Sequence, residues 1–470
     1  MTSSSEMSIQ GLDLGIESLL SGYRDKSLSP FDVISTVYDR IEAYPDKAVW
    51  ISLVTRQEAL VYTQSLVAKH TAGGGELPPL FGVPFSVKDS IDIAGYPTTL
   101  ACPSFAYKAE RTALVVQKIL DAGAVLVGKT NLDQFATGLN GTRSPYGAPR
   151  CVYDSKYISG GSSSGSVVSV AASLVSFTVG TDTAGSTRVP AALNGVVGLK
   201  PTLGSISTVG LVPACKNADC VTIMARKIGD AKAAWAVMRG FDEEDVYARR
   251  TPPSWPWKWP AADRIRFGVP PASLLTVLCP EYASLFSTAV QTLTDSLGLV
   301  PSPEFDYGTF AEANDMLYGS SVVAQRLVAF DEYIQTHGLE QLHPAVRSIF
   351  AASGGFDAVR AYQDIFALAG LRRRAEQQFR DGIDVLVVPS TVQHFTVEEM
   401  EAEPLARNRL LGSFSHFVNL LDLCAVAVPT GTWTNASGNK MPFGVTLIAQ
   451  AGRDDELMEL GGRLMAACGW

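Results

Sequence analysis

Short apolar runs that alternate with helical patterns constrain the fold of this 470-residue chain more than any other feature. Runs with so few polar interruptions are typical of strands that are buried on both faces of a sheet. The helical patterns between them would cover those faces, so we expect an α/β fold with a covered sheet. The segments that we assign to strands are 80–95, 124–128, 383–388, 424–428 and 443–448. In the first of these segments, we expect the strand itself to end near Lys88.

Helical patterns occupy much of the remaining chain. Residues 8–70 read as helical, with Ser29 suited to cap a helix and Pro30 suited to its first turn. We therefore describe residues 1–75 as an N-terminal helical layer. Further helices are expected at 110–122, where Gly123 ends the helix, at 167–177, and over most of 281–380.

A segment rich in proline and tryptophan, residues 251–260, is the clearest interruption in the chain. Its four prolines and three tryptophans do not suit a helix or a central strand. Because strand-like runs of the same kind resume after it, we interpret it as a surface crossover rather than a linker between domains. The prediction is a single domain over residues 1–470.

Composition excludes several classes of protein. A net charge of −9 without long charged runs disfavours nucleic acid or an anionic membrane as the main partner. No stretch is long and apolar enough for a transmembrane helix, and the polar N-terminus does not resemble a signal peptide. Seven cysteines, an odd number without zinc-finger spacing, suit reduced thiols better than disulfides or a metal site. We expect a cytoplasmic protein without a metal.

Three polar segments carry the chemistry: 84–89, 160–166 and 180–188. In the third, Ser186 follows the small residues Ala184 and Gly185, which allow backbone amides to approach a substrate oxygen. Amide hydrolysis needs a nucleophile, a base and donors for the oxyanion. We assign Ser186 as the nucleophile. The candidate oxyanion donors are the amides of Thr183, Ala184, Gly185 and Ser186.

Lys88 is the candidate base. Burial disfavours the charged form of a lysine and can make its amine available to accept a proton. Ser162, in the glycine–serine segment, is suited to relay that proton between Lys88 and Ser186. Two alternatives stay open: an ordinary ion-paired lysine, and a Ser-His-Asp triad that uses one of the five histidines. None of the five histidines lies in these three segments, which weakens the second alternative.

These three segments together resemble the amidase signature family, whose members use a Ser-cisSer-Lys triad. Ser186 matches the nucleophile, Ser162 the cis-peptide serine and Lys88 the base, and the two serines lie 24 positions apart, as is usual in the family. The resemblance implies a large mixed, twisted sheet with helices on both faces. It also implies a small amide or carbamate substrate, no cofactor, and a homodimer.

Within that family, the chain looks most similar to allophanate hydrolases. The resemblance lies in segments 130–139, 181–194 and 212–220. It also covers a Tyr and an Arg eight positions apart, which bind the substrate carboxylate in those enzymes and match Tyr318 and Arg326. A guanidinium is suited to that role because it binds carboxylates bidentately. By the same resemblance we group Gly138 with the substrate-binding residues and expect Asp182 and Arg188 to orient the nucleophile turn.

Departures from the pattern leave the substrate open. We expect this protein to lack the C-terminal domain usual in allophanate hydrolases. In addition, Thr187 replaces a usual glycine, and Ser320 and Ser321 replace bulkier residues. The main prediction is an allophanate-hydrolase-like amidase. The alternatives are a urethanase that cleaves carbamate esters, a broad aryl amidase, one component of an amidotransferase that works with partners, and a binding protein that only retains the fold.

Overall fold

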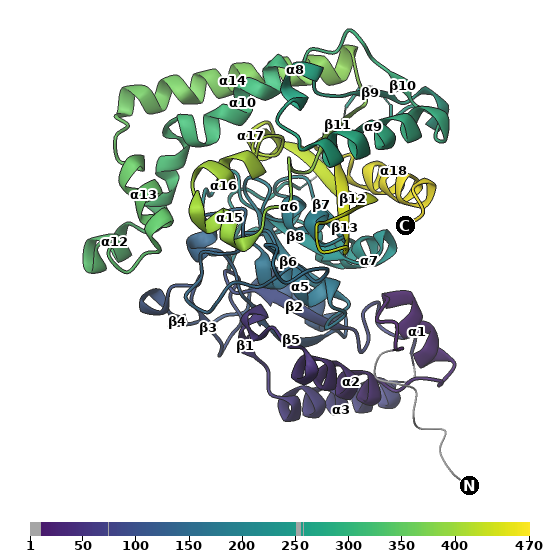
Figure 1. Cartoon of the computed structure of the whole chain (residues 1–470). Coiled ribbons are helices and arrows are strands. Elements are labelled where there is room, and N and C mark those ends of the chain that lie inside the picture. The colour runs from purple at the N-terminus through teal and green to yellow at the C-terminus, as the bar shows by residue number, and fades with distance from the viewer. Residues whose placement is uncertain (1–10, 74, 251–254, 257) are drawn as a thin grey trace.

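The computed structural model describes residues 11–73, 75–250, 255–256 and 258–470 (Figure 1). Within these ranges the main element is an 11-stranded sheet with the order β1-β5-β2-β6-β8-β7-β12-β13-β11-β9-β10. The strands are β1 (Trp50–Leu53), β2 (Pro84–Lys88), β5 (Val125–Thr130), β6 (Phe177–Asp182), β7 (Val197–Lys200), β8 (Cys220–Ala225), β9 (Arg266–Gly268), β10 (Val300–Pro301), β11 (Val385–Pro389), β12 (Leu423–Thr434) and β13 (Lys440–Gln450). A separate pair consists of β3 (Pro97–Thr98) and β4 (Tyr107–Lys108).

The sheet is mixed, as expected. Strand β2 runs parallel to both β5 and β6, whereas β6 is antiparallel to β8, and β12 is antiparallel to both β7 and β13. Every residue of β2, β5, β6, β8 and β11 is buried, including polar residues such as Lys88 of β2 and Asp182 of β6.

Helices pack against the sheet in two groups. Helices α5 and α6 contact each other and the central strands, while α7 contacts α4, α18 and strands β6, β7 and β8. A further layer, α8 to α14, extends along one side of the molecule, away from the N-terminal helices α1 to α3 (Figure 1). The bounds are α1 (Ile16–Arg24), α2 (Pro30–Ala43), α3 (Arg56–Gly73), α4 (Leu114–Asp121), α5 (Ser164–Ala171), α6 (Arg188–Leu193), α7 (Ile228–Met238), α8 (Ala272–Leu275), α9 (Pro280–Asp295), α10 (Gly308–Gly319), α11 (Gln325–Ala329), α12 (Asp331–His337), α13 (Pro344–Ser353), α14 (Ala358–Asp381), α15 (Val397–Ala402), α16 (Ala406–Leu411), α17 (Phe417–Leu420) and α18 (Asp454–Ala467).

Local signals placed several boundaries correctly. The Ser29 side chain accepts a hydrogen bond from the Phe31 amide, and Pro30 occupies the first position of α2. Helix α4 ends just before Gly123, whose φ of +91° is accessible mainly to glycine. Helices also dominate residues 281–380, as expected.

Two assignments were wrong. The N-terminal layer is interrupted by β1, which pairs with the edge of β5, and the predicted helix over 167–177 ends at Ala171. Phe177 instead begins β6, where it lies in register with Phe85 of β2 and Ala225 of β8. In both places pairing with a neighbouring strand, remote in sequence, overrides the local helical pattern.

Two further points concern the limits of the fold. Residues 251–254 and 257 of the predicted crossover lie outside the described residues, so that prediction stays untested. Among the residues that are described, none of the helices combines the length and apolar character needed to cross a bilayer.

Candidate active site

The ends of two adjacent parallel strands bring the three sequence segments together. Lys88 is the last residue of β2, and Asp182 is the last residue of β6. Since these strands are parallel neighbours, their carboxyl ends meet at one edge of the sheet, where sites of α/β proteins commonly form. The segment before α5, which carries Ser162, reaches the same edge.

The Lys88 amine lies in a buried site that contains hydroxyl partners but no ion-paired carboxylate among the described residues. Its Nζ donates to Ser162 Oγ and Thr181 Oγ1, each at 2.8 Å. Burial lowers the pKa of Lys88 to about 7, against the opposing effect of the more distant Asp133, Asp182 and Asp219. Near neutral pH, a large fraction of the Lys88 amine is therefore uncharged and able to accept a proton.

Ser162 follows a cis peptide bond from Gly161. Its carbonyl accepts hydrogen bonds from the amides of Asp133 (3.0 Å) and Ser164 (2.9 Å), which fixes the turn that leads into α5. Gly161 is required here because a Cβ would overlap the Asp133 carboxylate. The Ser162 hydroxyl is thus held against Lys88 by its own backbone contacts.

Ser186 lies on the turn between β6 and α6. The preceding Gly185 has a backbone φ of +125°, which residues other than glycine rarely adopt. The Ser186 carbonyl accepts a hydrogen bond from the Ser163 amide at 3.3 Å, so the two serine segments are in direct contact. In the described ranges the Ser186 hydroxyl has no hydrogen-bond partner, and the residue is 4% exposed. No histidine among these residues is bonded to Ser186, unlike the arrangement in a Ser-His-Asp triad.

One of the four predicted oxyanion donors is already engaged. The Gly185 amide donates to Asp182 Oδ1 at 2.7 Å, so in this arrangement it is not free for an oxyanion. The prediction is corrected to Thr183, Ala184 and Ser186, whose amides donate to no other group within the described part of the chain. The Asp182 carboxylate folds back over the start of α6, a contact that the sequence pattern does not reveal.

Asp182 and Arg188 form a buried ion pair that holds the nucleophile turn. Arg188 donates to both carboxylate oxygens, from Nε at 2.9 Å and from Nη2 at 2.8 Å. Burial favours a raised pKa for Asp182, but Arg188 and the surrounding donors hold that pKa below its ordinary value. Arg188 also donates to the Ser415 carbonyl and to Asn419 Oδ1, which tie the turn to α17 and to the residues just before it.

The structure brings Arg326 and Gly138 together. Arg326, at the start of α11, is buried and donates to Thr137 Oγ1 at 2.7 Å, directly beside Gly138. A Cβ on Gly138 would lie 2.5 Å from the Asp133 carboxylate, which explains the glycine. Burial works against the charge of Arg326, yet nearby Cys215, Tyr318 and Asp219 raise its pKa above the ordinary value. Arg326 is therefore a buried cation.

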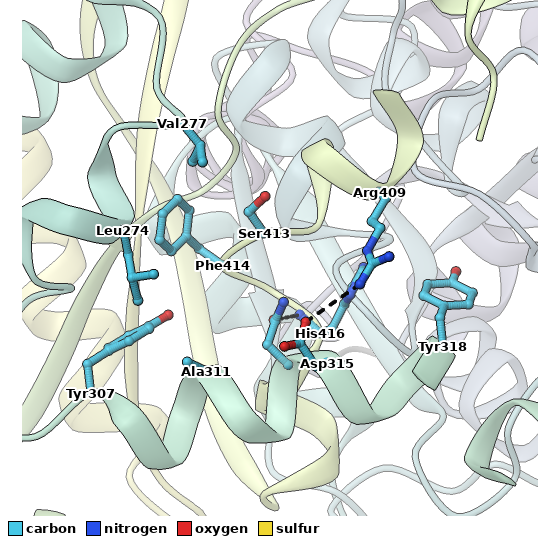
Figure 2. Close-up of a pocket in the computed structure, with 11 residues that line it drawn as sticks. Leu274, Val277, Tyr307, Ala311, Asp315, Tyr318, Arg409, Ser413, Phe414 and His416 are labelled. Atoms are coloured by element: carbon cyan, nitrogen blue, oxygen red, sulfur yellow. Dashed lines mark hydrogen bonds and ion pairs between the residues drawn. The ribbon is translucent and has the colours of Figure 1, made fainter. Parts of the chain in front are cut away.

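Tyr318, at the end of α10, lies close to Arg326. Its ring packs edge-to-face on His416, with ring centroids 5.3 Å apart, and both residues line a cavity of about 220 Å³. Figure 2 shows the other walls of the cavity, which come from α10, the segment around Leu274 and Val277, and residues 409–414. The cavity thus lies beside the predicted carboxylate-binding pair, and Ser186 is not one of its lining residues.

Several residues that position the site were not singled out from the sequence. Thr181 shares Lys88 with Ser162, and Asp219 accepts from Thr183 Oγ1 at 2.5 Å. Ser415 donates to the Ala184 carbonyl at 2.6 Å from more than 200 positions away. Thr181 could have been found from the sequence, because it lies in the same segment as the predicted nucleophile, Ser186, at the end of the buried strand β6. The other two depend on tertiary contacts.

Comparison with known proteins agrees with this geometry. The family model described as amidase matches residues 32–458. The urea amidolyase of Lachancea kluyveri is 40% identical over 421 residues, which cover 89% of this chain and 22% of that protein. The chain thus spans about a fifth of the length of the urea amidolyases that it matches.

Two further relatives match over most of this chain. The structure of the Kluyveromyces lactis allophanate hydrolase superposes with a TM-score of 0.87 at 37% identity, covering 98% of this chain and 73% of that one. A glutamyl-tRNA(Gln) amidotransferase component of Deinococcus deserti is 32% identical over 427 residues, which cover 85% of this chain and 86% of that protein. With this fold and this extent of similarity, the chain belongs to the amidase family, and it is similar along almost its whole length to the solved allophanate hydrolase.

Proposed function

We propose that this enzyme hydrolyses the C–N bond of a small amide or carbamate through Ser186, Ser162 and Lys88. One observation carries the proposal: the Lys88 amine is buried, has a pKa of about 7 and donates to the Ser162 hydroxyl at 2.8 Å. A lysine in this state is suited to act as a base near neutral pH. Ser186, without a hydrogen-bond partner in the described ranges, is suited to attack a carbonyl carbon.

In the acylation step, Lys88 accepts the Ser162 proton while Ser162 accepts the proton of Ser186. The Ser186 Oγ forms a bond to the carbonyl carbon, and the amides of Thr183, Ala184 and Ser186 face the oxyanion. The proton then returns through Ser162 to the substrate nitrogen, the C–N bond breaks, and ammonia or an amine leaves.

In the deacylation step, water attacks the ester of Ser186 and gives its proton to the same relay. The bond between Ser186 and the acyl carbon breaks, the proton returns to Ser186, and the acid product leaves. The net reaction adds one water across the C–N bond, with no change in oxidation state.

We further propose allophanate, H₂N–CO–NH–COO⁻, as the substrate. Arg326 supports this proposal, because it is a buried guanidinium without an ion-pair partner among the described residues, close to Gly138 and Tyr318. A substrate carboxylate would supply that partner. Hydrolysis of the terminal C–N bond then releases ammonia and leaves an N-carboxycarbamate.

Turnover of the purified protein on allophanate, an aryl carbamate ester and an aryl acetamide tests both proposals. We expect preference for allophanate, no activity in Ser186→Ala, and loss of the preference in Arg326→Ala. A preference for the carbamate ester or the acetamide that does not depend on Arg326 would identify a urethanase or broad amidase. Activity that survives in Ser186→Ala would overturn the mechanism.

An amidotransferase role is a second candidate, because the similarity to the amidotransferase component of Deinococcus deserti covers most of that protein. The net charge of −9 argues against direct contact with tRNA. Co-purification with other proteins, and glutamine hydrolysis that depends on them, would favour this candidate over independent turnover of allophanate.

We also propose a homodimer in the cytoplasm. On α14, Val359, Tyr362, Ile365 and Phe366 are 57–70% exposed, at spacings that place them on one side of the helix. Apolar groups gathered in this way are typical of contacts between protomers. The described cysteines are all free, which suits a reducing compartment. Phe366→Glu is expected to halve the mass measured by sedimentation, whereas the exposed Val246→Glu is expected to leave it unchanged.

A further inference from the structure

Two buried arginines meet at Thr137. Arg326 donates from Nη1 to the Thr137 hydroxyl at 2.7 Å, and Arg143 donates from Nη1 to the Thr137 carbonyl at 2.8 Å. Both side chains are almost fully buried, and their charges are close enough that Arg326 helps to lower the pKa of Arg143, although burial is the larger cause. Sequence motifs pointed to Arg326 alone.

The two arginines lack carboxylate partners. Across the described ranges, neither forms an ion pair, and the buried Nε of Arg143 has no hydrogen-bond partner. The Asp133 carboxylate influences Arg143 electrostatically, but it accepts hydrogen bonds from the backbone amides of Asn140, Gly141 and Arg143. Unpaired buried charges are costly in free energy, so two neighbouring cations indicate a site that an anion completes.

The fork of Arg143 also connects two segments. Its Nη2 donates to the Pro404 carbonyl at 2.7 Å, in the connection between α15 and α16, while Nη1 holds Thr137. A lysine at this position would provide the charge, but it lacks the planar guanidinium fork with which Arg143 reaches two carbonyls at once. Arg143 therefore determines the position of Thr137, and with it the neighbouring Gly138 and the Arg326 guanidinium.

We propose that Arg143 is a positioning and specificity-determining residue of the subsite for the substrate carboxylate. It holds the Thr137–Gly138 segment against Arg326 and adds a second positive charge, so that the enzyme selects small amides that carry a carboxylate over neutral amides of the same shape. This inference rests on the function proposed above for the same site. The groups facing Arg143 are Arg326, Tyr318, Asp133 and His343.

A matched pair of substrates tests the inference. Malonamate has CH₂ in place of the NH of allophanate and carries one carboxylate, whereas malonamide is its neutral counterpart. For Arg143→Met we expect the ratio of kcat/KM for malonamate to kcat/KM for malonamide to fall at least tenfold below the wild-type ratio. Arg143→Lys is expected to recover part of the affinity for malonamate, because it restores the charge but not both hydrogen bonds.

Arg407→Met is the matched control. Arg407 lies three residues beyond Pro404 but is paired with Glu399 and Glu403. The Arg407→Met variant is expected to keep the wild-type ratio of kcat/KM for malonamate to kcat/KM for malonamide. Equal changes for malonamate and malonamide in Arg143→Met, or an unchanged preference, would show a structural role only and overturn the inference.

Two further measurements separate this inference from the function on which it rests. If the wild type shows no Ser186-dependent turnover, the proposed function fails. Calorimetric binding of malonate then decides the inference: we expect binding by the wild type, weakened at least tenfold in Arg143→Lys. Absence of binding to the folded wild type, or equal affinity in Arg143→Lys, overturns it. The same binding comparison applies if Arg143→Met does not fold.

Discussion

The turn that carries Ser186 and the Thr137 segment both bury arginines. They differ in whether a carboxylate of the protein is paired with the arginine charge. In the turn, Arg188 binds both oxygens of Asp182, and its remaining donors reach Ser415 and Asn419. In the Thr137 segment, Arg143 and Arg326 donate to neutral oxygens of Thr137 and Pro404, and Arg326 also interacts with Tyr318. The first arrangement is complete in the protein itself, and we propose that an anionic ligand completes the second.

The same contrast separates two lysines on neighbouring strands. Lys129 of β5 lies 3.3 Å from Asp89 and donates to the Pro97 carbonyl and to Thr98. Lys88 of β2 has hydroxyl partners only, and its pKa is lowered to about 7. Paired buried charges support the fold, whereas buried charges without a counterion are the groups that the proposed chemistry needs.

Lys88→Met should have the largest effect on activity. We expect kcat to fall about 1,000-fold or more, equivalent to about 4 kcal/mol of transition-state stabilisation, because the proposed base is lost. The fold should persist, since no carboxylate loses its partner. Lys129→Met is the contrasting variant, expected to lower the free energy of unfolding because Asp89 is left unpaired. Retention of wild-type turnover by Lys88→Met would refute its role.

Asp182→Asn should have the largest effect on stability. Removing one partner of the buried pair leaves the Arg188 charge uncompensated, which typically costs about 3–5 kcal/mol. Denaturant unfolding measures this loss. Glu17→Gln, which breaks the exposed pair with Arg24, should cost less than about 1 kcal/mol. Similar losses in the two variants would contradict the importance given to the buried pair.

In contrast to Asp182→Asn, Arg326→Met should affect substrate binding more than stability. Because Arg326 has no ion-pair partner in the described residues, its loss should change the free energy of unfolding by less than about 1 kcal/mol. The KM for a carboxylated amide should rise about 10- to 100-fold, since a charged hydrogen-bond donor is lost. Steady-state kinetics and thermal unfolding of the same preparation check both values. A large loss of stability with unchanged KM would assign Arg326 to the fold.

The pH dependence is the smallest effect. Lys88 acts in its neutral form, so kcat should rise with pH up to about 7 and level off above it. At one pH unit below the pKa only about a tenth of Lys88 is neutral, and kcat should be about tenfold below the plateau. A profile measured from pH 5 to 9 tests this sign. A rate that falls as pH rises through 7 would show that the charged amine is required.

Local sequence identified much of this molecule. The apolar runs of β5, β11, β12 and β13 marked buried strands, because burial on both faces requires apolar residues at successive positions. The residue types of the candidate triad could also be recognised, since Lys88, Ser162 and Ser186 lie in short segments of unusual composition. Local patterns did not predict two features that depend on segments remote in the chain. These are the pairing of strand β1 with β5 and the end of α5 at Ala171.

The sequence by itself determined the α/β class, the order of the elements and the three residues that we propose for catalysis. Only the tertiary structure decided which charges are paired, which amides remain free to bind an oxyanion, and that Arg143 lies beside Arg326. The physical reason is that a charge or a donor acquires its role from the groups that surround it after folding. The lowered pKa of Lys88 and the engagement of the Gly185 amide both arise from contacts that form only when distant segments meet.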